Sequence, residues 1–264
     1  MTRYAFIDGG YLREKFGVFT KTYFGIEETQ PKSLDFDAIK TYFGGEKVFY
    51  YDAIDDSELR NESGEQRRKR LESQESYFDG IRSHYGYHVR LGSVTGTYKR
   101  LRQKQVDVLL AVDMLHHGFH RNMTHAVLLS GDLDFKPIVD SLVQHGIWVS
   151  VSYDQSGVSK ELRWSADEND RIKPTDYWNW CRPEFREAHL NSFPKFASQR
   201  GISPVIAKTI TLPMAVVEIH TIPGTRDHAA VSSSPIFPSG DTAIHHHDLD
   251  ALEKFVTDMY GGSE

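Results

Sequence analysis

The alternation of short apolar runs with segments of helical periodicity constrains this chain more than any other feature of its sequence. Each run has the length of a strand and stops near turn-forming residues, which is typical of strands buried in a sheet. Strands are expected at residues 4–7, 47–51, 87–91, 126–130 and 147–151. Strands that alternate with helices form a mostly parallel sheet with both faces covered, because every connection must cross over the sheet. The sequence therefore predicts an α/β fold with a mostly parallel five-stranded sheet.

Helical periodicity occupies the intervals between these strands. Helices are expected at residues 35–43, 57–84, 106–115, 135–145 and 159–164. In the fourth of them, Phe135, Ile138 and Leu142 recur at the spacing of one helix face, and Gly146 ends the helix. A basic loop over residues 99–104 is expected ahead of the third helix.

The length of 264 residues suits one α/β domain with an extension better than two ordinary domains. We expect a domain over residues 1–180 and a C-terminal extension over residues 181–264. Residues 191–247 contain scattered Pro, Gly and Ser without a sustained period, so they are expected to be largely linker. Residues 248–260 recover a helical pattern with one apolar face, which predicts an amphipathic helix. That face either docks on its own chain or binds a protein partner or a second copy.

The composition excludes several classes of protein. Apolar residues make up 39% of the chain and charged residues 26%, which is typical of a globular protein rather than a disordered or fibrous one. No apolar run approaches the roughly 20 residues that span a bilayer, and residues 1–3 lead directly into a strand, so we expect a cytoplasmic protein. The single cysteine, Cys181, cannot form an internal disulfide or a paired-thiolate zinc site. The net charge of −6 argues against a protein that coats nucleic acid, but it leaves room for a local basic strip.

Acidic residues stand where a parallel sheet binds its ligands, beyond the carboxyl ends of the strands. Asp8 follows the first expected strand, and Asp132 and Asp134 follow the fourth. Glycines beside these positions let the backbone turn sharply there. Asp107 lies in the first turn of the helix after the basic loop, where the helix dipole favours a carboxylate. We expect these four side chains to meet at one edge of the sheet.

A cluster of carboxylates requires a cation. Bringing several carboxylates within about 4 to 6 Å raises their pKa values unless a positive charge neutralises them. Mg²⁺ and Mn²⁺ suit such a site, and they can activate water and stabilise the leaving oxygen of a phosphoryl displacement. An isolated aspartate after a strand is more often a turn or cap residue, so the prediction depends on the coincidence of all four. Asp113 is a weaker candidate, because it points about 120° away from Asp107 around the same helix.

Four segments resemble the signatures of a known family. They are Phe6-Ile7-Asp8-Gly9-Gly10-Tyr11-Leu12, Lys104-Gln105-Val106-Asp107, Leu110-Ala111-Val112-Asp113-Met114 and Leu129-Ser130-Gly131-Asp132-Leu133-Asp134-Phe135. In this order they are similar to the signatures of NYN domains, in the LabA-like or DUF88 branch of the PIN-like nucleases. The resemblance spans residues 2–175.

The resemblance implies a PIN-like three-layer α/β/α fold, dependence on Mg²⁺ or Mn²⁺, and hydrolysis of RNA. It maps the catalytic and metal-binding acids onto Asp8, Asp107, Asp132 and Asp134. The sequence departs from the family where many NYN domains carry an asparagine soon after the first aspartate, since Gly10-Tyr11 stands there. A role of that asparagine in orienting water or substrate is therefore not carried over.

Candidates for substrate binding lie close to these acids in the chain. A basic run directly ahead of Asp107 is suited to hold the phosphates of an RNA backbone, which would make binding salt-sensitive. It consists of Lys99, Arg100, Arg102 and Lys104. Ser130 precedes the second glycine turn, and Tyr11 is placed to stack an unpaired base, although core packing explains a tyrosine there equally well. A second basic run, residues 67–70, is interpreted as a solvated helix face because acidic residues flank it.

Several activities remain open at this point. The first is an endoribonuclease that acts on single-stranded or loop RNA, whose backbone bends into an acidic pocket more readily than a duplex does. The alternative is a catalytically weak RNA-binding or regulatory adaptor that retains the fold, and carboxylates alone do not exclude a DNA nuclease. A phosphatase of the haloacid dehalogenase type is disfavoured, because it needs a second aspartate two residues after Asp8, where Gly10 stands. The sequence therefore predicts a divalent-metal-dependent ribonuclease first.

Overall fold

The computed structural model describes residues 1–28, 30–56, 62–92, 99–154, 158–199, 202, 205–234, 236–237 and 242–261, with the backbone alone for residues 99–105. Contacts divide the chain into two compact units. The first contains residues 1–17 and 28–172, and the second contains residues 18–27 and 173–264. The helix α1 (Gly9–Phe24) therefore contributes its first half to one unit and its second half to the other.

A parallel six-stranded sheet forms the centre of the first unit, in the order β3-β2-β1-β4-β5-β6. Its strands are β1 (Arg3–Asp8), β2 (Lys47–Ala53), β3 (Tyr87–Gly92), β4 (His125–Leu129), β5 (Trp148–Asp154) and β6 (Glu168–Ile172). Each strand runs parallel to its neighbours, which confirms the expected α/β fold with a mostly parallel sheet. The sequence does not predict β6, because this edge strand reads Glu-Asn-Asp-Arg-Ile and contains no apolar run.

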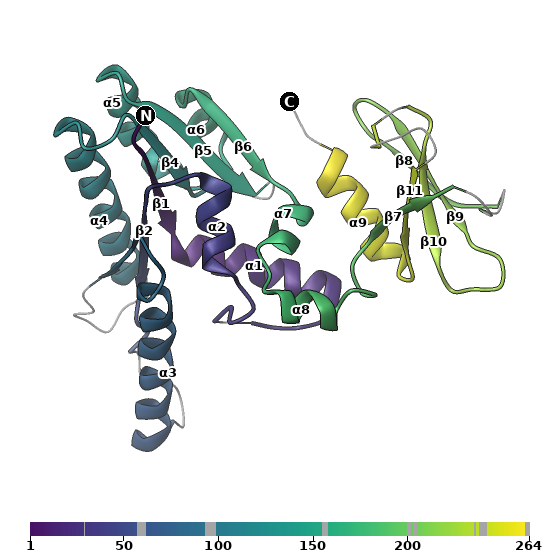
Figure 1. The fold of residues 1–264 in the computed structure, drawn as a ribbon, viewed down its shortest axis with the longest axis horizontal. Coiled ribbons are helices and arrows are strands. Elements are labelled where there is room, and N and C mark those ends of the chain that lie inside the picture. The colour runs from purple at the N-terminus through teal and green to yellow at the C-terminus, as the bar shows by residue number, and fades with distance from the viewer. Residues whose placement is uncertain are drawn as a thin grey trace. The chain divides into compact units, whose positions relative to one another are not determined.

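Helices cover both faces of this sheet (Figure 1). They are α2 (Phe36–Phe43), α3 (Gly64–Arg82), α4 (Lys99–Phe119), α5 (Lys136–Gln144) and α6 (Lys160–Ser165), together with the start of α1. On one face, Leu110 of α4 and Leu142 of α5 join a buried cluster with Phe6 of β1. On the other face, the ring of Phe36 contacts the ring of Tyr50, with 6.0 Å between the ring centroids. Each fully buried aromatic or leucine side chain contributes about 1.5–3 kcal/mol, so both layers hold the sheet in place.

Two helical segments differ from the sequence-based expectation. The helix α1 begins at Gly9, in a stretch that was not predicted to be helical. A Cβ atom at position 9 would lie 2.5 Å from the ring of Tyr50, so close packing requires this glycine. The helix α4 begins at Lys99, and the prediction of a basic loop over residues 99–104 is therefore wrong. Lys, Arg, Leu and Gln are strong helix formers, and this local preference outweighs the repulsion among the charges.

The second unit holds a five-stranded antiparallel sheet, in the order β7-β11-β10-β9-β8. Its strands are β7 (Lys195–Ser198), β8 (Ile206–Thr211), β9 (Val216–Thr221), β10 (His228–Ser232) and β11 (Thr242–His246). The prediction that residues 191–247 are largely linker is therefore wrong. The edge strands β7 and β8 are mostly exposed, and the sheet is joined by antiparallel backbone pairing. Such strands need few apolar residues, so the sequence carries no long period there.

Beside the second half of α1, the described residues of the second unit include the helices α7 (Pro174–Asn179), α8 (Pro183–Ala188) and α9 (Leu249–Tyr260). The helix α9 contacts β10 and β11, and its yellow ribbon lies beside the sheet in Figure 1. Asp248 caps it by accepting a hydrogen bond from the backbone N of Ala251 at 2.8 Å. Leu252 and Phe255 are fully buried, so the apolar face predicted over residues 248–260 docks within its own unit. A partner or second copy bound through the rest of this helix stays a prediction.

Membrane insertion has no candidate segment among the helices that the structure describes. None of them combines the length and the apolar character that crossing a bilayer requires.

Candidate active site

The strand order of the first unit reverses between β1 and β4, and ligands bind at such a switch point in parallel sheets. Ile7 of β1 is the register partner of Leu129 of β4, so the residues that follow these two strands come together. Asp8 and Ser130 are those residues. The Ser130 hydroxyl donates a hydrogen bond to Oδ2 of Asp8 at 3.2 Å, which ties the two strand ends to each other.

A pocket of about 730 Å³ opens beyond these strand ends. Its lining comprises Asp8, Gly10, Tyr11, Arg13, Glu14, Lys15, Asp52, Ala53, Ile54, Asp55, Val106, Asp107, Ser130, Gly131, Asp132, Leu133 and Ser159. Three of the four acids predicted from the sequence therefore line one pocket, although they come from β1, from α4 and from the turn after β4. The fourth, Asp134, is not part of the lining.

Asp8 is held in a defined orientation. Its Oδ1 accepts a hydrogen bond from the backbone N of Tyr11 at 3.0 Å, while its Oδ2 accepts the bond from Ser130. Burial raises the pKa of Asp8 to about 6, and the charges of Asp52 and Asp132 act in the same direction, against the two hydrogen bonds. The carboxylate is therefore oriented by its neighbours but not neutralised by them.

Asp107 is a partly buried carboxylate of α4. Burial is the main reason that its pKa is raised to about 7, followed by the negative charges of Asp8, Asp132 and Asp134. Asp8 and Asp132 come from the two other segments of the pocket lining, β1 and the turn after β4. The three acids of the lining form what we call the acidic wall: Asp8, Asp107 and Asp132.

The turn after β4 gives its two aspartates different positions. Asp132 precedes the short 3-10 helix η1 (Leu133–Phe135) and caps it, since its Oδ1 accepts a hydrogen bond from the backbone N of Asp134 at 2.9 Å. The backbone N of Asp132 donates to the Ser130 hydroxyl at 3.2 Å, which connects this turn to Asp8. Asp134 lies outside the pocket lining, and it acts on the site through its charge near Asp107.

Asp113, the weaker sequence candidate, lies on another part of α4. Its Oδ2 accepts a hydrogen bond from the hydroxyl of Tyr51 at 3.0 Å and forms an ion pair with Arg90 at 3.4 Å. It does not line the pocket. The angular separation from Asp107 around the helix places the two side chains in different surroundings.

The acidic wall suits a hydrated divalent cation. In the part of the chain that the structure describes, no three histidine, cysteine or carboxylate groups meet at the spacing of a preformed metal cage. Mg²⁺ seldom needs such a cage, because it is usually bound by one or two carboxylates, several waters and the phosphates of the substrate. The hard oxygen donors of Asp8, Asp107 and Asp132 fit this mode of binding.

Comparison with known families identifies the first unit. The model of the NYN domain matches residues 19–170, which is more than half of the chain. The chain belongs to the NYN domain family. NYN domains are PIN-like and are generally nucleases. The match includes Asp107, Asp132 and Asp134 and begins after Asp8.

Curated proteins and solved structures were also compared with this NYN domain. No curated protein matches the chain. Among solved structures, a protein of unknown function from Vibrio parahaemolyticus is similar at 15% identity and a TM-score of 0.43, with 65% of this chain and 93% of that chain covered. At this TM-score the likeness carries no inference about fold or activity.

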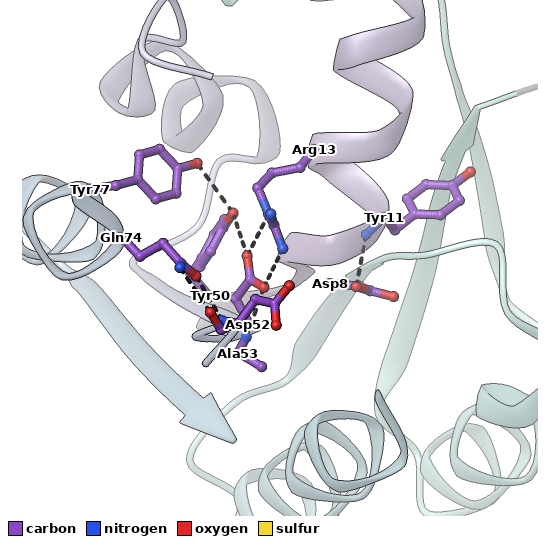
Figure 2. Close-up of polar contacts among 9 residues, drawn as sticks. Asp8, Tyr11, Arg13, Tyr50, Asp52, Ala53, Gln74 and Tyr77 are labelled. Carbon is purple, nitrogen blue, oxygen red and sulfur yellow. Dashed lines mark hydrogen bonds and ion pairs between the residues drawn. The ribbon is translucent and has the colours of Figure 1, made fainter. Parts of the chain in front are cut away.

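The pocket of this NYN domain is also lined by Arg13 and Asp52, which the sequence does not predict as site residues. Arg13 of α1 donates two hydrogen bonds to Asp52 of β2, from Nε to Oδ2 at 2.8 Å and from Nη2 to Oδ1 at 2.7 Å (Figure 2). The hydroxyl of Tyr50 donates to the same carboxylate at 3.3 Å and lies 3.4 Å from the hydroxyl of Tyr77. Burial raises the pKa of Asp52, and the charge of Arg13 opposes that shift. We call Arg13 and Asp52 the paired wall.

A signal for the paired wall is present in the sequence. Asp52 lies near the carboxyl end of a predicted strand, in the same kind of place as Asp8. Arg13 has no such signal, because the helix that carries it was not predicted.

Tyr11 and Lys15 lie on successive turns of α1 and both line the pocket. The Tyr11 hydroxyl accepts a hydrogen bond from the backbone N of Asp154 at 2.8 Å, which joins α1 to the end of β5. The ammonium group of Lys15 lies 5.4 Å from the centre of the Tyr11 ring and 3.1 Å from Glu14. Lys15 is thus a cation beside the acidic wall that the sequence reasoning missed.

The basic run selected from the sequence lies at the start of α4. The side chains of Lys99, Arg100, Arg102 and Lys104 fall outside the described residues. Their contact with phosphates stays a prediction.

Proposed function

We propose that this NYN domain is a ribonuclease that depends on Mg²⁺ or Mn²⁺ and hydrolyses phosphodiester bonds of single-stranded or loop RNA. The observation that carries this proposal is the acidic wall, in which carboxylates from three separate segments line one pocket at the switch point of the sheet. Structural aspartates are normally paired or exposed, whereas Asp8 and Asp107 have raised pKa values in a pocket open to a ligand.

Asp8, Asp107 and Asp132 would hold the divalent cation. Asp134 adds negative charge near Asp107, and this favours a cation further. A cation bound there supplies Lewis-acid polarisation of the phosphate and lowers the pKa of the attacking water. The chain's own contribution is orientation, because Ser130 and the backbone N of Tyr11 fix both oxygens of Asp8 before any ligand binds.

Lys15 supports the choice of a phosphodiester substrate. Lys15 lines the same pocket as the acidic wall, so it can bind a phosphate next to the reacting one while the acids hold the cation. Single-stranded RNA suits this pocket, because its backbone can bend toward the acids more readily than the backbone of a duplex.

The proposal is tested by incubating the protein with labelled single-stranded RNA in Mn²⁺, in Mg²⁺ and in EDTA. Wild type is expected to cleave in either metal and to lose cleavage in EDTA. Asp8→Asn and Asp107→Asn should each reduce cleavage by about 10²–10³-fold, because each removes charge that the reacting centre needs. Asp140→Asn is the matched control, since this carboxylate lies on α5 in an ion pair with Lys136 and outside the pocket.

Three outcomes would overturn the proposal. Cleavage that persists in EDTA would exclude metal dependence. Undiminished cleavage by both pocket variants would exclude a catalytic role of the acidic wall. A wild-type protein that binds the RNA tightly but never cuts it is an adaptor, in which the fold is retained without catalysis. Single-stranded DNA is included as a second substrate, and a preference for it replaces RNA in the proposal.

A further inference from the structure

A stack of three rings crosses the sheet of the first unit. Phe6 of β1, Phe49 of β2 and His88 of β3 are successive register partners, so their side chains lie in one row on one face. The ring centroids of Phe6 and Phe49 are 5.2 Å apart with an interplanar angle of 10°, and those of Phe49 and His88 are 5.0 Å apart at 22°. Offset stacking at such distances is the favourable geometry for ring pairs.

The stack ends at the surface. Phe6 and Phe49 are buried, but His88 is exposed, because β3 is the edge strand of the sheet. Among the described residues, Phe49 is the ring that His88 contacts, and the imidazole makes no hydrogen bond with them. The row therefore presents a flat, exposed ring whose inner face is already supported by two others.

Two cations flank this exposed ring. Arg90 follows His88 by two residues on the same strand and lies on the same face, with half of its side chain exposed. Lys47 begins β2 and precedes Phe49 by two residues, so it shares the face as well. The pKa of His88 is lowered, first by partial burial of the ring and then by the charges of Lys47 and Arg90.

Other titratable groups around the ring come from α4. Asp113 forms the ion pair with Arg90, and His117 packs against Phe49 with 4.8 Å between the ring centroids. Burial lowers the pKa of His117 as well, so this imidazole is neutral at physiological pH. Two cations against one carboxylate leave a net positive charge beside the ring.

A second row of register partners on the same face includes the first acid of the pocket. Asp8, Tyr51 and Arg90 are successive register partners on β1, β2 and β3, so Arg90 lies in the same cross-strand row as the first pocket acid. Two strand spacings separate their Cα atoms by roughly 10 Å. Tyr51 in the middle of this row is fully buried and hydrogen-bonded to Asp113 of α4, so a single strand with its reacting phosphate at Asp8 has to pass around α4 to reach Arg90 and His88.

We propose that His88, Lys47 and Arg90 form a subsite for single-stranded RNA, in which His88 stacks on one unpaired base and the two cations bind the phosphates beside it. This subsite rests on the proposed ribonuclease function and adds to it the recognition of an unpaired base away from the cleaved bond. Aromatic rings next to cations are how sequence-tolerant single-strand binders hold RNA, because every base offers a flat face. A duplex, whose bases are already stacked on each other, does not fit an exposed ring.

The test measures the Kd of fluorescein-labelled single-stranded RNA by anisotropy in Ca²⁺ buffer, and cleavage of the same RNA in Mn²⁺ alongside. His88→Ala is expected to raise Kd on the order of tenfold, and His88→Phe, which keeps a flat ring, to stay within about twofold of wild type. Arg90→Gln should reduce the slope of log Kd against log salt by about 0.7, the contribution of one phosphate contact on a single strand. Tyr85→Ala is the matched control, because this ring is 89% exposed, lies beside Lys40 and is not part of the stack.

A second measurement distinguishes the loss of stacking between His88 and a base from a structural change caused by the substitution. RNA with one abasic nucleotide, moved along the strand, should bind wild type more weakly at one position. At that position the difference between wild type and His88→Ala should disappear. Equal Kd values for wild type and His88→Ala overturn the subsite, and so does equal weakness of His88→Ala and His88→Phe. A wild type that cleaves the RNA while all variants bind alike overturns the subsite alone, whereas a wild type that neither binds nor cleaves overturns the ribonuclease function as well.

Discussion

The two walls of the pocket differ in the groups that their carboxylates contact. On the paired wall, Asp52 is 4% exposed and receives two hydrogen bonds from one guanidinium group. On the acidic wall, burial first and the neighbouring carboxylates second raise the pKa of Asp8 to about 6 and that of Asp107 to about 7. A buried charge that is paired supports the fold, whereas charges left to repel one another reduce stability and are available to a ligand. The paired wall therefore has a structural role in the pocket, whereas the acidic wall is expected to bind the ligand.

The largest change in stability is expected on the paired wall. Arg13→Ala leaves the carboxylate of Asp52 buried without its partner, and the free energy of unfolding should fall by about 3 kcal/mol, because a buried charge without a partner is costly. Urea denaturation of the metal-free protein measures this. Arg82→Ala is the control, since its ion pair with Asp79 is exposed on both sides and should contribute less than about 0.5 kcal/mol. Similar losses in both variants would show that the paired wall has no special structural role.

The acidic wall should respond to metal instead. Mn²⁺ at one hundred times its Kd is expected to raise the free energy of unfolding of wild type by about 2.7 kcal/mol, because it binds the folded state alone. Asp107→Asn should gain much less. Thermal unfolding with Mn²⁺ and with EDTA measures the difference, and Asp140→Asn serves as the control. Equal stabilisation of wild type and Asp107→Asn would place the metal elsewhere.

The pH dependence of stability should report on the acidic wall. The folded pKa values of Asp8 and Asp107 lie above the ordinary value of 3.8, so their protonation favours the folded state. Their contribution is fully present below pH 3.8 and is lost as the pH rises through 6 and 7. Asp107→Asn should therefore gain stability relative to wild type from pH 4 to pH 8, on the order of 1 kcal/mol, in urea denaturation without metal. A difference that does not change with pH would mean that burial and the neighbouring charges do not raise the pKa of Asp107.

The smallest effect is expected at Tyr11, another residue of the pocket lining. Tyr11→Phe removes the hydroxyl that accepts a hydrogen bond from the backbone N of Asp154, and this should cost about 1 kcal/mol. The backbone N of Tyr11 still holds Asp8, so cleavage should fall by less than the loss expected for Asp8→Asn. Comparing the RNA cleavage rate of Tyr11→Phe with that of Asp8→Asn tests this. Equal losses of cleavage rate in the two variants would show that the Tyr11 hydroxyl takes part in the reaction.

The sequence predicts the residues of the acidic wall more completely than those of the paired wall. Asp8 and Asp132 follow apolar strands, and the carboxyl ends of parallel strands meet at one edge, so local pattern and topology together predict that they converge. Asp52 meets the same criterion but becomes significant only through Arg13, which lies on a helix that the sequence pattern does not show. The choice between Asp132 and Asp134 depended on the turn, because Asp132 lines the pocket while Asp134 supplies the backbone N that it caps.

The sequence by itself determined the parallel sheet of the first unit and the edge at which its acids lie, because the period of apolar residues along a chain reflects burial on a strand or a helix. Tertiary structure alone decided which charges are paired, that the His88 ring ends a stack at a sheet edge, and that residues 195–246 include five strands. These depend on which distant segments meet. Polar and partly exposed strands are held by backbone pairing with distant partners, and backbone groups are the same in every residue, so the sequence carries little trace of them.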